Sequence, residues 1–83
     1  MEATSFLVKV FSPFEIFYEG EVTSLSASNS EGPFDVLAEH ANFITLLSAG
    51  NLQIVTPFGP RELALERGIL RVQNGRATVF ANV

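Results

Sequence analysis

The 83-residue chain contains no cysteine and no tryptophan, and His40 is its single histidine. Without cysteine, neither a disulfide framework nor a thiolate metal site can form. One histidine supplies at most one imidazole ligand or one general base, so a zinc centre and a Ser-His-Asp relay are both poorly supported. The sequence therefore predicts a non-catalytic domain that is held together by packing and needs no cofactor.

Long apolar runs are also missing, because the longest covers only a few residues and a membrane span needs ~18 to 20. The first residues, Met1–Ser5, lack the basic and apolar regions of a secretory signal, which predicts a chain that stays unprocessed in the cytoplasm or a lumen. The net charge of −4 opposes the phosphate attraction that nucleic-acid binding requires. We therefore expect neither a membrane span nor a nucleic-acid partner.

Apolar residues are abundant, at 47% of the chain, and eight of them are phenylalanine. A domain of this length buries only about 60 to 65% of the surface of its unfolded chain. Aromatic rings that each offer more than ~150 Å² can supply much of that burial, so the simplest expectation places the phenylalanines in the core. If several of them instead shared one outer face, the exposed patch would mark a docking surface.

Charge is distributed unevenly along the chain. Seven of the nine acids lie in the first 40 residues, where Lys9 is the only base, whereas the last 33 residues contain four arginines. Solvated strand faces explain such a distribution, and so does a domain whose opposite ends meet different partners. The sequence alone leaves both interpretations open.

Apolar residues alternate at period two through most of the chain, which is typical of strands. The alternating runs are residues 6–11, 15–18, 22–27, 52–56 and 62–66. We expect Gly20 to allow a tight reversal between the second and third runs. Val22 and Leu25 are an odd number of residues apart, and a bulge or a twist at Thr23-Ser24 would let both point inward.

Residues 28–33 are rich in turn-forming residues and predict a loop. The following stretch is ambiguous. Its apolar residues fit an amphipathic helix over Asp35–Leu47, but they also fit two short strands, Phe34–Leu37 and Phe43–Ser48. We favour the strands because the surrounding chain is rich in β-formers.

The most specific local pattern is Asn74-Gly75, the dipeptide of a type I′ hairpin turn, in which both central residues need positive φ. Pairing the chain about this turn places Leu70 opposite Val79 and Val72 opposite Ala77, all on one face. With eight to ten short strands and turns between them, the sequence predicts an all-β fold. We expect a single domain over residues 1–83, a flattened β-sandwich or barrel.

Four segments in order resemble one protein family. They are Tyr18–Leu25, Glu31–Ala41, Gly50–Ile54 and Gly68–Ala81. The epsilon subunits of F-type ATP synthases have the corresponding patterns F/Y-x-G-x-V, E-G-x-x-G-I-L-P-G-H-A-P, G-x-L-x-I and G-x-x-x-V…V-T-V-L-A. The sequence is therefore similar to the N-terminal β-sandwich domain of that family. It departs from the family where Ala38-Glu39 stands in place of Pro-Gly, Asp35 in place of Gly and Asn42 in place of Pro.

The resemblance implies two strands joined by a surface loop across the ambiguous stretch, with His40 in the loop. It also implies a non-catalytic rotor subunit that binds the gamma subunit and the c-subunit ring, peripheral to the cytoplasmic face of a bacterial inner membrane or an equivalent organellar face. The C-terminal helices that most members carry are absent from residues 1–83, so we expect either a naturally short epsilon subunit or the N-terminal domain alone. The resemblance predicts partner contacts at Glu31, Gly32, Pro33, His40, Ala41, Asn42 and Thr45.

Simpler interpretations exist for the same residues. His40 could be a general base or merely solvent-exposed, and Glu31-Gly32-Pro33 could be only a turn. The glycines lack the spacing of a phosphate-binding loop, so nucleotide binding is not indicated. A free-standing β-sandwich that binds carbohydrate or peptide is the alternative function, although the lack of tryptophan and the single tyrosine argue against carbohydrate.

Overall fold

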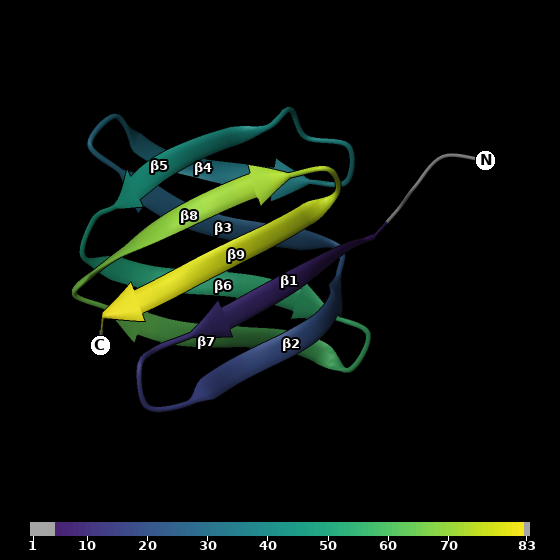
Figure 1. Cartoon of the computed structure of the whole chain (residues 1–83), viewed down its shortest axis with the longest axis horizontal. Coiled ribbons are helices and arrows are strands. Elements are labelled where there is room, and N and C mark those ends of the chain that lie inside the picture. Colours follow the sequence, from purple (N-terminus) through teal and green to yellow (C-terminus); the bar gives the residue numbers. More distant parts are fainter. Residues whose placement is uncertain (1–4, 83) are drawn as a thin grey trace.

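The computed structural model describes residues 5–82, which form nine strands in two sheets and no helix (Figure 1). The strands are β1 (Phe6–Phe11), β2 (Ile16–Val22), β3 (Ser24–Asn29), β4 (Gly32–Leu37), β5 (Phe43–Leu47), β6 (Gly50–Thr56), β7 (Gly59–Leu65), β8 (Arg67–Gln73) and β9 (Arg76–Asn82). The predicted all-β sandwich is confirmed.

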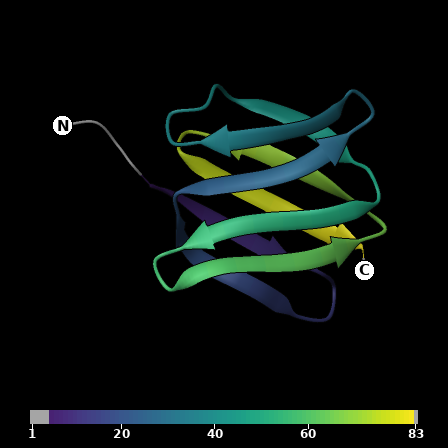
Figure 2. The ribbon, with the colours of Figure 1, turned by 180° about the vertical axis from the view of Figure 1, so that it is seen from behind.

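The two sheets lie face to face, and the reverse view in Figure 2 shows the smaller one in front. The five-stranded sheet has the order β2-β1-β9-β8-β5, and the four-stranded sheet has the order β4-β3-β6-β7. Four antiparallel hairpins build most of this arrangement, while β1 and β9 pair in parallel and so join the first strand to the last. The N-terminal and C-terminal strands therefore stabilise each other at the centre of the larger sheet.

Aliphatic side chains from alternate strand positions fill the space between the sheets. Leu25, Leu70, Val22 and Val79 are completely buried, and smaller residues such as Ala77 and Ala81 complete the layer. The alternation predicted from sequence thus sets which face of each strand is buried, since successive side chains of a strand point to opposite faces.

The predicted hairpin about Asn74-Gly75 is confirmed with its register. Leu70 pairs with Val79 and Val72 with Ala77, and Asn74 and Gly75 have φ values of 52° and 76°. The ambiguous stretch forms two strands, β4 and β5, joined by residues 38–42, so the alternative of a helix is excluded.

The predicted reversal at Gly20 is wrong, because β2 continues through Gly20 to Val22. Gly20 has a packing role instead. A β-carbon there would lie 3.2 Å from the Tyr18 hydroxyl, which donates a hydrogen bond to the Glu21 carbonyl oxygen. A larger residue at this position would push the tyrosine hydroxyl aside by a few tenths of an ångström.

Val22 and Leu25 both point inward, as expected, but they do so because the chain changes sheets. Thr23 separates β2 of the larger sheet from β3 of the smaller one, and its N–H donates to the Val55 carbonyl oxygen. The odd spacing therefore marks a crossing between layers, in place of the bulge within one strand that the sequence suggested.

The loop predicted over residues 28–33 is too long. Strand β3 extends to Asn29 and β4 begins at Gly32, so only Ser30 and Glu31 form the turn.

The expectation that the phenylalanines form the core is also wrong, since Phe6 alone among those of the described residues belongs to the buried core. A layer about 10 Å thick between two sheets is filled by valine, leucine and alanine, which leaves most rings at the rim or outside.

Gly68 offers a test of the packing between β8 and β9. A β-carbon at this position would lie 2.8 Å from the backbone oxygen of Phe80, which cannot move without disturbing the ladder. We expect Gly68→Ala to lower the free energy of unfolding by about 1 to 3 kcal/mol, measured by urea denaturation. The exposed Asn51→Ala is the control and should change it by less than about 0.5 kcal/mol.

Candidate functional site

The two outer faces of the sandwich differ in chemistry. On the four-stranded sheet, neighbouring strands are linked by polar pairs, in which Ser26 donates to Asp35 at 2.6 Å and Gln53 donates to Glu62 at 2.5 Å. The outer face of the five-stranded sheet instead carries most of the exposed large apolar side chains. An interaction surface is therefore indicated on the larger sheet.

Apolar residues form one continuous row across the five strands of that sheet. The row is fixed by strand register, because each member pairs with the next on the neighbouring strand. From β2 to β5 its members are Ile16, Phe11, Phe80, Ile69 and Leu46. The rings of Phe11 and Phe80 meet edge to face at 5.4 Å, and Leu46 is 71% exposed. We call this row the apolar band.

Basic residues lie beside the apolar band on the same face. Lys9 and Arg71 flank Thr78 in the adjacent row of the sheet, and Arg76 precedes Thr78 by two residues on β9. The Lys9 ammonium group lies 5.2 Å from the centre of the Phe11 ring. We call Lys9, Arg71 and Arg76 the basic patch. The exposed Glu19 pairs with Lys9 on the same face, so a partner that covers it would complement it with apolar groups and with charges of both signs.

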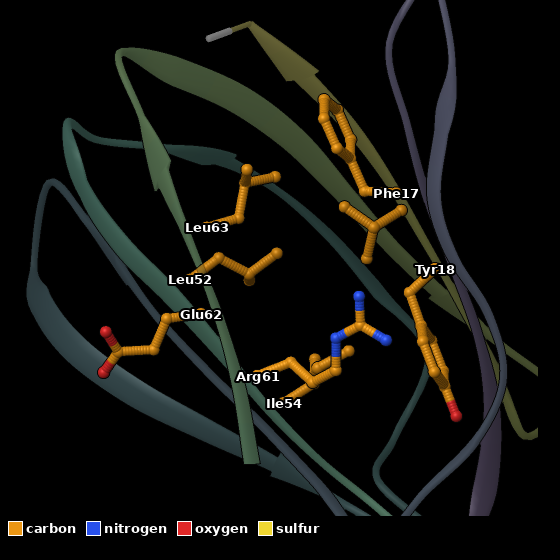
Figure 3. Close-up of a pocket in the computed structure, with 8 residues that line it drawn as sticks. Phe17, Tyr18, Leu52, Ile54, Arg61, Glu62 and Leu63 are labelled. Atoms are coloured by element: carbon orange, nitrogen blue, oxygen red, sulfur yellow. The ribbon is translucent and has the colours of Figure 1, made fainter.

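A small cleft opens between the sheets on the side of β2 and β7 (Figure 3). Its volume is about 110 Å³, and its lining is mainly apolar, with Leu52, Ile54 and Leu63 among the residues that contribute. The Arg61 guanidinium group lies 5.7 Å from the centre of the Tyr18 ring, so this pair connects the edge strands β7 and β2 at the cleft. The cleft is smaller than ordinary ligand pockets, which span roughly 300 to 1,000 Å³.

Glu31, Gly32 and Pro33 lie at one end of the sandwich, at the turn between β3 and β4. The Asn29 side chain fixes this turn from two sides. Its oxygen accepts a hydrogen bond from the Glu31 N–H at 2.9 Å, and its amide nitrogen donates to the Thr45 hydroxyl at 3.1 Å. Asn29 thus joins an exposed tip to strand β5 of the other sheet.

His40, Ala41 and Asn42 lie at the opposite end, in the loop between β4 and β5, and all three are exposed. Glu39 has φ 69° at a position where the epsilon pattern has glycine, so the loop keeps a left-handed backbone without that residue. The Asn42 side-chain oxygen accepts a hydrogen bond from the Asn74 N–H at 2.9 Å. The loop is therefore tied to the β8–β9 turn.

The seven residues predicted to contact partners do not form one cluster. Three lie at the β3–β4 tip and three in the far loop, while Thr45 faces inward opposite the buried Leu70 and is bonded to Asn29. The sequence reasoning missed the apolar band. Its members were visible as the outward residues of alternating strands, but only the order of the strands in the sheet brings them into a row.

Comparison with known proteins identifies the family of this domain. Residues 5–83 match the family described as "ATP synthase, Delta/Epsilon chain, beta-sandwich domain". The chain belongs to this ATP synthase family. An ATP synthase epsilon chain of Psychrobacter sp. (strain PRwf-1) is 41% identical over 75 residues, and one of Clostridium novyi (strain NT) is 31% identical over 81 residues.

These two alignments cover 89% and 96% of this chain but only 54% and 62% of the epsilon chains that it matches. Its fold resembles one in the Euglena gracilis mitochondrial ATP synthase (OSCP/F1/c-ring), with a TM-score of 0.86 at 18% identity over 95% of this chain and 51% of that one. A chain of the Tetrahymena thermophila mitochondrial ATP synthase central stalk and c-ring gives 0.79 at 13% identity, over 93% of this chain and 63% of that one.

Within residues 5–82 the epsilon-family domain contains no helix of the length and apolarity needed to cross a bilayer.

Asn29 should be the residue on which the β3–β4 tip depends. We expect Asn29→Ala to lower the free energy of unfolding by about 1 to 3 kcal/mol, because the part-buried Thr45 hydroxyl and the Glu31 N–H both lose a partner. Amide exchange at Glu31 should also accelerate. Ser26→Ala, which removes an exposed hydrogen bond to Asp35, is the control and should leave both quantities nearly unchanged.

Proposed function

We propose that this domain acts as a non-catalytic rotor element of an F-type ATP synthase, at the cytoplasmic face of a bacterial inner membrane or the equivalent organellar face. The observation that carries the proposal is the apolar band on a domain of the epsilon family. Exposed apolar rows of this kind are typical of surfaces that a partner covers.

The gamma subunit is the partner proposed for the outer face of the five-stranded sheet. The apolar band supplies an area that gains from burial, and the charged residues beside it can pair with charges on the partner. The loop with His40, Ala41 and Asn42 leads directly into β5, an edge strand of the same sheet. A long partner lying along this face would therefore also reach that loop.

The c-subunit ring is the partner proposed for the opposite end, at Glu31, Gly32 and Pro33. This tip is exposed or half-buried, and the Asn29 side chain holds its backbone in place. A contact that must pass torque between two bodies benefits from a turn that is already ordered, because little conformational entropy is lost on binding. Thr45 contributes indirectly through its bond to Asn29.

A free-standing module for carbohydrate or peptide is less well supported. The cleft beside Arg61 and Tyr18 is small, and membership of the epsilon family favours a subunit of a complex.

The proposed gamma surface is tested by placing a charge in the apolar band. We expect Leu46→Asp to weaken binding to the gamma subunit at least tenfold, because a carboxylate would have to be desolvated at the interface, with affinity measured by calorimetry. The matched control is Leu37→Asp, since Leu37 is 57% exposed on the outer face of the other sheet. Equal affinities of the two variants would contradict this assignment.

The c-ring contact is tested by reversing the charge at the tip. We expect Glu31→Lys to reduce the fraction of the subunit that remains on c-ring-containing ATP synthase after washing, while its affinity for isolated gamma subunit stays unchanged. Glu62→Lys is the control, because Glu62 is an exposed glutamate of β7 in the four-stranded sheet, outside both proposed contact surfaces. Loss of gamma affinity in Glu31→Lys, or full retention on the complex, would count against a c-ring contact at this turn.

A further inference from the structure

Two phenylalanines project almost completely into solvent, one at each end of the sandwich. Phe14 is 94% exposed in the turn between β1 and β2, and Phe58 is 95% exposed in the turn between β6 and β7. Each follows a hydroxyl residue and a proline, in Ser12-Pro13-Phe14 and Thr56-Pro57-Phe58. An aromatic ring exposed to this degree contributes nothing to the core, so its role must be sought elsewhere.

The turn that carries Phe14 is ordered by its own hydrogen bonds. The Ser12 hydroxyl oxygen accepts from the N–H groups of Phe14 and Glu15 at 3.2 and 3.3 Å. The Ser12 N–H donates to the Glu15 carbonyl oxygen at 2.9 Å, and Pro13 restricts φ between them. The backbone that holds the ring is therefore fixed before any partner arrives, which lowers the entropic cost of binding.

Phe14 also continues the apolar band. Its turn begins after Phe11 and ends before Ile16, and these two residues pair with each other in the sheet. Both belong to the band, so the turn that carries Phe14 adjoins the band where β1 ends and β2 begins. The turn of Phe58 differs, because it connects the buried Thr56 to Gly59 in the sheet whose outer face is polar.

We propose that Phe14 is an aromatic anchor that enters an apolar pocket of the gamma subunit when that subunit covers the apolar band. The inference rests on the proposed function and adds a residue outside the sheet to its interface. Aromatic side chains are enriched at protein interfaces, and a few buried anchors carry most of the binding energy. The assignment to gamma follows from the continuity of Phe14 with the band.

The experiment compares Phe14→Ser with Phe58→Ser in the full natural chain that contains this domain. Both rings are equally exposed, so neither change should shift the thermal midpoint of unfolding. Binding to the gamma subunit is measured by calorimetry. We expect the dissociation constant to rise at least tenfold in Phe14→Ser and to stay within twofold of the wild-type value in Phe58→Ser.

Each outcome bears on a different claim. Tight wild-type binding that Phe14→Ser leaves within twofold would overturn the anchor but not the proposed function. If Phe14→Ser is retained less well on c-ring-containing ATP synthase but keeps its affinity for gamma, the partner that binds Phe14 is not gamma. A larger effect in Phe58→Ser would place the anchor at the other end of the domain. Failure of the wild-type chain to bind gamma would overturn the proposed function together with the anchor.

Discussion

One layer of aliphatic side chains between two sheets supports everything else in this domain. Leu25, Leu70, Val22 and Val79 lie in it without measurable exposure, and the strands of Leu70 and Val79 alternate between buried and exposed residues. Since the layer is thin, branched aliphatic and small residues fill it more readily than rings. Most of the aromatic side chains are consequently left at the rim or on the surface.

The alternation that fills the core also builds the surface proposed to bind a partner. Residues that point away from the layer on β2, β1, β9, β8 and β5 fall into register, and one row of five is apolar throughout. The other sheet presents polar pairs in the equivalent positions. A partner that docks on this face would meet a stiff, hydrogen-bonded sheet with an apolar outer surface.

Side-chain hydrogen bonds stabilise the turns of this domain. Ser12, Asn29, Asn42 and Thr56 each hydrogen-bond to the backbone of a turn, either their own or a neighbouring one. Short-range rules found the Asn74-Gly75 turn because positive φ restricts its residue types. They could not find the bond from Asn29 to Thr45, because it connects strands of different sheets. Thr45 was predicted as a partner contact from the family resemblance alone.

The strand class, the faces of most strands and the last hairpin could be predicted from the amino-acid sequence, because these depend on period-two alternation and on turn chemistry within a few residues. The segments resembling epsilon subunits also led to the family. Three features became visible only in the folded domain: Thr23 is a crossing between sheets, Gly20 makes room for Tyr18, and Phe11 and Phe80 belong to one exposed row. Those features depend on which strands become neighbours, and that order follows from packing between residues far apart in the chain.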